Sequence, residues 1–325
     1  MIGYYIHHQG SGHRMRAEAI TDRLRVPVVA LSSADITSTV FADRITLTRD
    51  DLTDTPSDVD ANGALHWAPR LDDGLRTRMV EIAEFVSVHR PDAMVVDVSV
   101  EVTAFVRLLG VPVVVTAMPG ERTDPPHLLA YRLADAIIAP WPKELYQPQW
   151  LTPHLHKTTF TGGISRFDGR PVRIDPDCES DVLVLTGTGG ATTSQAAVSQ
   201  LAGDHPELTI RGLGPAFGTW SDDPWRELCS ARLVVTNAGQ GSVADVAVAQ
   251  KPAVILPQER PFDEQLRTGR NLARAGLAYV APSWPTASEW DTILASIPDA
   301  APPWSQWRTA GAAGRAAAAI EAVLG

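Results

Sequence analysis

The sequence lacks the features that mark several large classes of protein. Its 325 residues include only two cysteines, Cys178 and Cys229, and neither belongs to a CxxC pair or another metal-type spacing. Reduced thiols in a cytosolic protein are therefore expected. The N-terminus MIGYYIHH lacks the basic and long apolar regions of a signal peptide, and no apolar run approaches the roughly 20 residues of a membrane helix. These absences predict a cytoplasmic protein and give no indication of membrane association.

A net positive charge and the common nucleotide-binding motifs are also missing. The formal net charge is -10 with a pI near 5.3, which argues against a nucleic-acid partner and against adhesion to anionic lipid. No GxxxxGK[ST] motif occurs, so a P-loop kinase or ATPase is disfavoured. The GTGGAT stretch at 187–192 lacks the third glycine of the dinucleotide fingerprint and the acidic residue expected beyond it. An NAD site is therefore disfavoured as well.

What the chain does contain is a globular composition with alternating strands and helices. Hydrophobic residues make up 44% and charged residues 20%, and the length suits two domains. Continuous β-branched runs are joined by helical patterns, which predicts a parallel sheet covered on both faces in a doubly wound fold. The expected strands are 2–6, 26–31, 45–47, 93–99 and 111–117, and the expected helices are 14–25, 74–89 and 100–110.

A stretch rich in glycine, proline and charge interrupts this alternation at 161–180 and is interpreted as an interdomain linker. The alternation then restarts. We expect an N-terminal domain at 1–160, a C-terminal domain at 181–306 and a helix at 307–325, for which packing back on the first domain is one option. The predicted fold class is α/β: two tandem, doubly wound, Rossmann-like domains whose parallel sheets face a cleft.

Three glycine-rich turns stand where a predicted strand gives way to a helix, at 9–13, 187–190 and 237–242. A helix N-terminus offers unpaired N–H groups and partial positive charge, and glycine lets a phosphate approach the backbone. Open α/β sheets also bind ligands beyond the carboxyl ends of their strands. Each turn alone is equally consistent with a tight turn and a helix cap. Together they predict one phosphate-binding cleft.

Residues 231–278 carry a longer pattern: a strand, the turn NAGQGS, a helix with an acidic residue, KP before an apolar strand, then DEQ and a helix with NLARAG. This segment resembles the donor-binding half of GT-B glycosyltransferases. It is most similar to glycosyltransferase family 28, which holds the bacterial peptidoglycan N-acetylglucosaminyltransferase and the monogalactosyldiacylglycerol synthases. GSGHRMRAEAI at 10–20 resembles the GGGH turn of the lipid galactosyltransferases, and GGISR at 162–166 resembles an element at the domain hinge. The resemblance implies a GT-B fold, in which the domain at 1–160 is the acceptor-side domain and the domain at 181–306 is the nucleotide-sugar donor domain.

The resemblance also implies roles for particular residues, most of them on the donor side. It places the donor diphosphate at the start of a helix, near Asn237, Gly239, Gln240, Gly241 and Ser242. Other phosphate contacts are expected from Thr188, Gly189, Gly190 and Arg166. Ribose is expected at Asp245, the nucleobase at Trp220 and Ser221, and the sugar or ribose at Asp263, Glu264 and Gln265. Gly10, Ser11 and Gly12 shape the turn on the acceptor side.

Direct displacement at a sugar carbon needs a base for the acceptor hydroxyl, and His13 is the candidate. A histidine is largely neutral at pH 7 and can take a proton. Asp97, near the end of the strand AMVVDVS, is the candidate orienter, because a buried carboxylate fixes an imidazole tautomer and stabilises the imidazolium. In plant and antibiotic glycosyltransferases of the same fold, an aspartate in a similar strand orients such a histidine. The alternative for Asp97 is a helix N-cap before VEVTAF.

The remaining histidines of the first half admit other interpretations. His7 and His8 are adjacent on a predicted strand and should point to opposite faces, so a metal site shared with His13 is disfavoured. One of the two is expected in the core and the other in the cleft. His66 and Trp67 lie in a polar loop that either closes over an acceptor or is an ordinary surface loop.

These observations lead to a functional hypothesis: a metal-independent, inverting glycosyltransferase without a cofactor. Its co-substrate would be a nucleotide-diphosphate sugar, with UDP or dTDP as the expected nucleotide, and its acceptor would be a hydroxyl compound. Two alternatives stay open. One is a nucleotide-sugar 2-epimerase of the same fold, and the other is a non-catalytic nucleotide-sugar binding protein.

Overall fold

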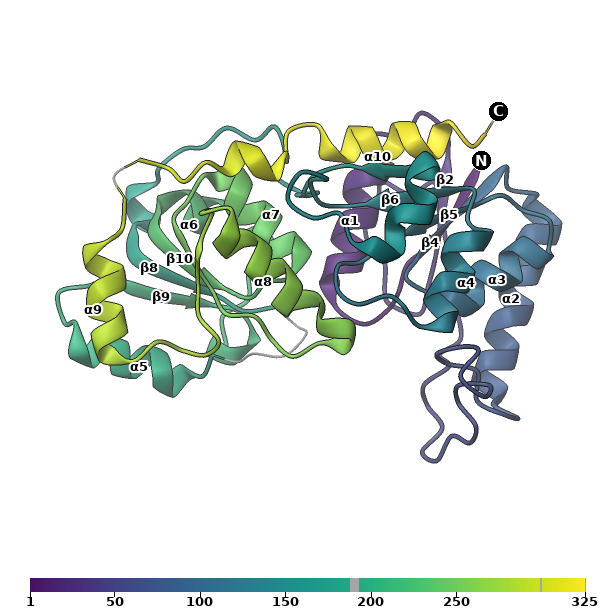
Figure 1. Cartoon of the computed structure of the whole chain (residues 1–325), viewed down its shortest axis with the longest axis horizontal. Coiled ribbons are helices and arrows are strands. Elements are labelled where there is room, and N and C mark those ends of the chain that lie inside the picture. The colour runs from purple at the N-terminus through teal and green to yellow at the C-terminus, as the bar shows by residue number, and fades with distance from the viewer. Residues whose placement is uncertain (188–192, 299, 325) are drawn as a thin grey trace.

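The computed structural model describes residues 1–187, 193–298 and 300–324, which form two α/β domains side by side (Figure 1). The first domain is built on a seven-stranded parallel sheet in the order β3-β2-β1-β4-β5-β6-β7. Its strands are β1 (Ile2–Tyr5), β2 (Val28–Ser32), β3 (Asp43–Thr46), β4 (Ala93–Asp97), β5 (Val113–Thr116), β6 (Ala136–Ala139) and β7 (Thr158–Phe160). The central strands are buried throughout, as expected for a parallel sheet covered on both faces.

The helices of the first domain connect these strands and pack on the two faces of the sheet. They are α1 (Ser11–Thr21), α2 (Asp73–His89), α3 (Val100–Leu108), α4 (Pro125–Leu133) and the 3-10 segment η1 (Gln149–Lys157). Between β3 and α2 the chain forms a long loop, residues 47–72, that hangs from the sheet at the lower right of Figure 1. This loop carries His66 and Trp67.

The second domain is built on a five-stranded parallel sheet in the order β12-β11-β10-β8-β9. Its strands are β8 (Ser180–Leu185), β9 (Ile210–Leu213), β10 (Ala231–Thr236), β11 (Ala253–Ile255) and β12 (Tyr279–Val280). Its helical segments are η2 (Pro176–Cys178), α5 (Gln195–Asp204), η3 (Pro215–Phe217), α6 (Trp225–Ser230), α7 (Gln240–Ala249), η4 (Pro261–Asp263), α8 (Glu264–Arg274), α9 (Ala287–Ala295) and η5 (Trp304–Trp307). The predicted α/β fold with two doubly wound domains is confirmed.

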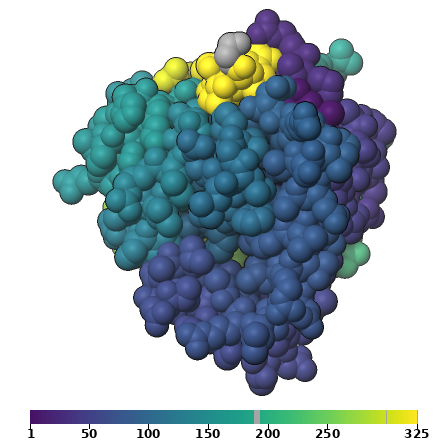
Figure 2. All heavy atoms as spheres, turned by 90° about the vertical axis from the view of Figure 1, so that its right-hand side faces the viewer, coloured from purple at the N-terminus to yellow at the C-terminus, as the bar shows by residue number. Residues whose placement is uncertain are grey.

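The chain crosses between the domains twice, and the two crossings lie side by side. On the way out, Ile164 still belongs to the first domain's core, whereas Phe167 is buried in the second. On the way back, Trp307 is buried in the second domain, and α10 (Ala312–Glu321) packs into the first. Gly163 N donates to Trp307 O at 3.0 Å, so the two crossings are hydrogen-bonded to each other. Figure 2 shows the C-terminal segment, in yellow, lying over the first domain.

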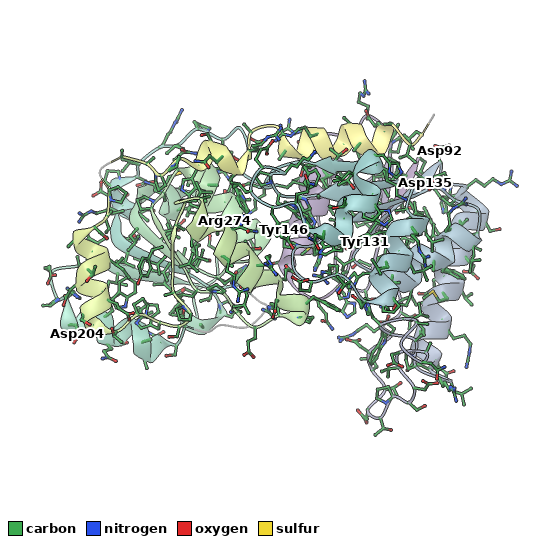
Figure 3. All side chains as sticks on the ribbon, viewed as in Figure 1. Asp92, Tyr131, Asp135, Tyr146, Asp204 and Arg274 are labelled. Atoms are coloured by element: carbon green, nitrogen blue, oxygen red, sulfur yellow. The ribbon has the colours of Figure 1, made fainter. Side chains whose placement is uncertain are left out.

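Further hydrogen bonds join the two domains near the cleft. Arg274 of α8 donates to Leu145 O of the first domain at 2.7 Å, and Figure 3 labels Arg274 beside Tyr146 at this boundary. Glu121 N donates to Phe262 O at 2.8 Å. Among the residues that the structure describes, no helix is long and apolar enough to cross a membrane.

The structure differs from the sequence-based expectation at several elements. β6 and β7 were not anticipated, because each holds only three or four residues and neither stands beside a recognisable helix pattern. α1 begins at Ser11 and not at Arg14, so His13 lies inside its first turn. The helix after the turn at 237–242 likewise starts early, at Gln240.

Candidate active site

A cavity of about 770 Å³ separates the two domains and is lined by residues from both. On the first-domain side its wall includes the head of α1, and on the second-domain side it includes the head of α7. Both helices follow directly on the carboxyl ends of parallel strands, β1 and β10. The cavity therefore lies where open α/β sheets bind ligands.

The two helix N-termini offer unpaired backbone donors to this cavity. The N-cap residues are Gly10 for α1 and Gly239 for α7, and neither contributes a capping side chain. Gly10 has a φ of 86°, which glycine adopts without strain. Gly12 would meet no atom within 4 Å if it carried a Cβ, so the space beside it is open. The cavity wall includes all the residues expected at these heads: Gly10, Ser11, Gly12, Asn237, Gly239, Gln240, Gly241 and Ser242.

The structure brings His13 and Asp97 together. His13 Nδ1 lies 3.0 Å from Asp97 Oδ2, and Asp97 is the last residue of β4 with its side chain fully buried. Ser99, not Asp97, caps α3, since it accepts from Val102 N at 3.2 Å. Because an ionised carboxylate only accepts, Nδ1 of His13 donates and its Nε2 keeps the lone pair on the cavity side.

Arg16 is part of the same group, although the sequence analysis did not identify it. Its Nη2 donates to Asp97 Oδ1 at 2.6 Å, and the side chain is 7% exposed. Burial alone would raise the pKa of Asp97, but Arg16 and then His13 outweigh it and leave the pKa at about 2. Nη2 also lies 3.1 Å from His13 Nδ1. A guanidinium cannot accept, so this contact is no hydrogen bond when Nδ1 carries the proton.

Arg16 also reaches across the cleft. Its Nη1 donates to Gln240 Oε1 at 3.0 Å, and Gln240 is the first residue of α7. One buried cation therefore joins the His13–Asp97 pair to the helix that is expected to hold the donor diphosphate. The sequence feature that could have identified Arg16 is the His-x-x-Arg spacing, which places Arg16 about one turn beyond His13 on the same face of α1.

On the donor side, Asp245 and Arg166 meet in the cavity wall. Asp245 accepts from Ser165 Oγ at 2.6 Å and lies 3.4 Å from Arg166 Nε. Burial raises the pKa of Asp245 to about 6, against the opposing effect of Arg166. Arg166 also donates to Asp222 O at 2.9 Å and covers the ring of Phe167. Its guanidinium is thus engaged by the protein, although it remains part of the cavity wall.

Four of the other residues that were expected to contact the donor line the cavity, and three lie outside the described residues. Trp220 and Ser221 line the cavity, with the Trp220 ring about half exposed. Gln265 lines it too, while its Oε1 accepts from Ala238 N and Gln258 N and so ties two strand ends together. Glu264 is in the wall. Thr188, Gly189 and Gly190 lie outside the described residues.

Asp263 was predicted to contact the donor in the cleft, but the structure does not place it in the described wall of the cavity. It is exposed and adopts a left-handed φ of 56° as the N-cap of α8. The conformation of the Phe262–Asp263 pair turns Phe262 toward the first domain, and Asp263 consequently faces outward. Of the three neighbouring residues in this run, only Glu264 and Gln265 reach the cleft.

His7 and His8 also differ from expectation. β1 ends at Tyr5, so the two histidines follow the strand instead of alternating along it. Their rings stack with centroids 5.1 Å apart, which contradicts the prediction of opposite faces. His7 lines the cavity, and burial, with His13 and His8 adding to the effect, lowers its pKa to about 4. His8 lies 3.2 Å from Asp51.

Comparisons with known proteins agree with this arrangement. Residues 218–284 match the model of the glycosyltransferase family 28 C-terminal domain. The chain is 29% identical to the UDP-N-acetylglucosamine--N-acetylmuramyl-(pentapeptide) pyrophosphoryl-undecaprenol N-acetylglucosamine transferase of Rubrobacter xylanophilus over 31% of this chain and 34% of that protein. The match thus spans about a third of the length of that relative.

Similar solved structures extend over the whole chain. The glycotransferase of kitacinnamycin has a TM-score of 0.71 at 16% identity, covering 100% of this chain and 99% of that one. MurG of Acinetobacter baumannii has a TM-score of 0.61 at 15% identity, covering 99% and 100%. UGT71G1 of Medicago truncatula, complexed with UDP-glucose, has a TM-score of 0.65 at 12% identity, covering 100% and 98%. The chain therefore has the two-domain fold of these glycosyltransferases, and its second domain contains a segment that matches the model of the glycosyltransferase family 28 C-terminal domain.

Proposed function

We propose that the protein transfers a sugar from a nucleotide-diphosphate sugar to a hydroxyl acceptor, with inversion and with His13 as general base. The observation that carries this proposal is the position of the Asp97-held His13 in the same cavity as the head of α7. A base and an anion-binding helix terminus on opposite walls are the two parts that direct displacement requires.

In the proposed reaction, the acceptor oxygen attacks the anomeric carbon of the sugar. The bond from that carbon to the diphosphate oxygen breaks, and the acceptor proton moves to Nε2 of His13. A single displacement of this kind inverts the anomeric centre. Asp97 holds the imidazole in the tautomer that presents Nε2 and stabilises the imidazolium that forms.

The leaving nucleoside diphosphate gains negative charge as the sugar becomes oxocarbenium-like. Backbone N–H groups at the head of α7, around Gly239 and Gln240, are placed to receive that charge. Arg166 and, from the opposite wall, Arg16 add positive charge near this helix terminus. This arrangement supports a mechanism in which the protein itself stabilises the leaving group.

The donor is proposed to be a UDP or dTDP sugar, bound with its base beside Trp220 and Ser221 and its ribose near Asp245. UDP sugars are the first choice, because the Medicago structure holds UDP-glucose and the Rubrobacter relative is named for UDP-N-acetylglucosamine. A thermal-shift panel of UDP, dTDP and GDP, with their sugars, tests this choice, since a ligand that binds the folded state raises its melting temperature.

The catalytic part is tested with His13→Ala. We expect this variant to lose transfer, by at least about a hundredfold for a removed general base, while it binds the nucleotide as tightly as wild type in calorimetry. Wild-type turnover in His13→Ala would refute the assignment. Incubation with UDP-N-acetylglucosamine alone, followed by NMR, distinguishes the 2-epimerase, and nucleotide binding without diphosphate release would indicate a binding protein.

A further inference from the structure

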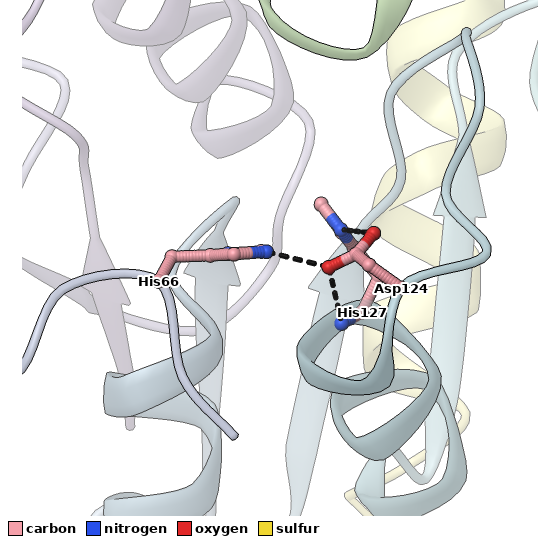
Figure 4. A group of neighbouring side chains, drawn as sticks. All are labelled: His66, Asp124 and His127. Carbon is pink, nitrogen blue, oxygen red and sulfur yellow. Dashed lines mark hydrogen bonds and ion pairs between the residues drawn. The ribbon is translucent and has the colours of Figure 1, made fainter. Parts of the chain in front are cut away.

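A second aspartate-held histidine lies in the same cavity as His13, on the side of the first domain. His66 Nε2 lies 2.7 Å from Asp124 Oδ2, and His127 Nδ1 lies 2.7 Å from Asp124 Oδ1 (Figure 4). His66 and His127 both line the cavity. The resemblance to known glycosyltransferases assigned no role to this group.

The loop that carries His66 is anchored firmly enough to hold it there. The backbone N–H groups of His66 and Trp67 both donate to Glu101 Oε1, at 2.8 and 3.0 Å. Trp67 Nε1 donates to Asp50 O at 2.7 Å. The 47–72 loop is therefore tied to the start of α3 at the residue that enters the cavity, which favours a functional position over an incidental surface loop.

The hydrogen bonds fix the proton on each ring. Arg122 Nη1 lies 3.1 Å from His127 Nε2, and a guanidinium only donates, so this nitrogen accepts and Nδ1 of His127 donates to Asp124. Burial first, and Arg122 second, lower the pKa of His127 to about 4, which keeps the ring neutral. His66 Nε2 donates to the other carboxylate oxygen of Asp124 by the same reasoning. Within the part of the chain that the structure describes, Nδ1 of His66 has no hydrogen-bond partner.

These three side chains meet the distance condition for a metal site, but their protons argue against one. A metal on Nδ1 of His127 would move that proton to Nε2, where it would face the N–H of Arg122. Arg122 itself is held by Glu264 at 3.2 Å and by the ring of Phe262, so it has little freedom to withdraw. The group is better described as a hydrogen-bonded chain that ends at a free imidazole nitrogen.

We propose that His66 is an acceptor-binding residue, whose Nδ1 accepts a hydrogen bond from a hydroxyl of the acceptor. The role proposed for His66 rests on the proposed function and extends it to the chemical class of the acceptor. The cavity then presents two imidazole nitrogens to the acceptor, Nε2 of His13 for the reacting hydroxyl and Nδ1 of His66 for another. An acceptor that satisfies both is a polyol or a sugar, not a monohydric alcohol.

The first test needs no turnover. Two-bond ¹H–¹⁵N correlation spectra of histidine-labelled protein at pH 8 should show His66 as the Nε2–H tautomer, and Asp124→Asn should abolish that preference. The Nδ1–H tautomer in the wild type would overturn the proposal. So would one equivalent of Zn²⁺ that shifts the His66 and His127 signals together, because it would show a metal site.

The second test measures transfer with a saturating donor to methyl β-D-glucoside and to cyclohexanol. His66→Phe keeps an aromatic ring beside Phe262 but loses both nitrogens. We expect its KM for the glucoside to rise about fivefold to tenfold, as for a lost neutral hydrogen bond, with kcat and donor hydrolysis by water within about twofold of wild type. The matched control, His156→Phe, replaces an exposed histidine outside the described cavity wall and should change none of these.

An unchanged KM in His66→Phe, with a melting temperature equal to that of wild type, would refute the proposal, as would equal wild-type turnover of cyclohexanol and the glucoside. Failure of the proposed function gives a different result: the wild type would release no nucleoside diphosphate from any donor, and the tautomer experiment would still decide whether His66 presents Nδ1.

Discussion

Replacing Arg16 with methionine should lower the stability of the fold and disturb His13, the proposed base. The change removes the guanidinium that donates to Asp97 and leaves a fully buried carboxylate with His13 as its remaining partner. The pKa of Asp97, held at about 2 against an ordinary value of 3.8, corresponds to about 2 kcal/mol of folding free energy. Because this pKa is depressed in the folded state, the contribution is present above about pH 4 and is lost as the pH falls toward 2.

The loss in Arg16→Met should exceed that figure, since breaking one side of a buried ion pair costs about 3–5 kcal/mol. Urea denaturation at pH 7.5 measures it. Arg14→Met is the matched control on the same helix. Arg14 makes a 3.9 Å contact with Glu18, a partly exposed i,i+4 pair, so its loss should cost less than about 1 kcal/mol.

A double-mutant cycle makes the reasoning refutable. Asp97→Asn in the Arg16→Met background removes the unpaired charge and should recover part of the loss, with a coupling energy of about 2 kcal/mol or more. If the stability losses of Arg16→Met and Asp97→Asn simply added in the double variant, Arg16 and Asp97 would not form the buried pair described above. A loss below about 1 kcal/mol in Arg16→Met alone would lead to the same conclusion.

Further predictions concern the boundary between the domains, the buried carboxylate of Asp245 and helix α10, which returns to the first domain. Gly120→Ala should lower the free energy of unfolding by about 3 kcal/mol, because the φ of Gly120 is 106° and an added Cβ would overlap Phe262 O. The control, Gly110→Ala, also has a positive φ but open space around it, and should lower the free energy of unfolding by about 1 kcal/mol. Asp245→Asn should stabilise the fold at pH 8 by at most about 3 kcal/mol, because burial raises the pKa of this carboxyl from 3.8 to about 6 and so penalises its charged form. The gain, measured by denaturation, should shrink as the pH falls from 6 toward 4, where the carboxyl becomes protonated in the unfolded chain as well. Nucleotide affinity should fall. Ile320→Ala, in a fully buried position of α10, should cost about 2–5 kcal/mol, and an unchanged midpoint would contradict its packing on the first domain.

The sequence predicted the features of this site that depend on local pattern. Continuous apolar runs located the central strands, and glycines located the turns at the heads of α1 and α7. The position of Asp97 at a strand end was also readable, because β4 is a clear β-branched run. Parallel strands bring their carboxyl ends to one edge, so the meeting of His13 with Asp97 followed from topology.

What could not be predicted depends on contacts between distant segments. Arg16 joins residues 81 and 224 positions away, and nothing local distinguishes it from a surface arginine on a helix. The direction of the His7 side chain depends on where β1 ends, and the ends of strands are poorly predicted from the hydrophobic pattern of the sequence. Asp263 turns outward because Phe262 adopts a left-handed backbone conformation, and the sequence there has no glycine or asparagine to indicate it.

The pair of hydrogen-bonded crossings has a consequence for how this chain can be engineered. Residues 165–307 leave and re-enter the first domain at neighbouring points, so the second domain is inserted into a first domain that is discontinuous in sequence. A chimera that exchanges the second domain must therefore be joined at both crossings and must retain α10 with the first domain. A single cut of the chain near residue 165 would separate the first domain from the helix that completes its core.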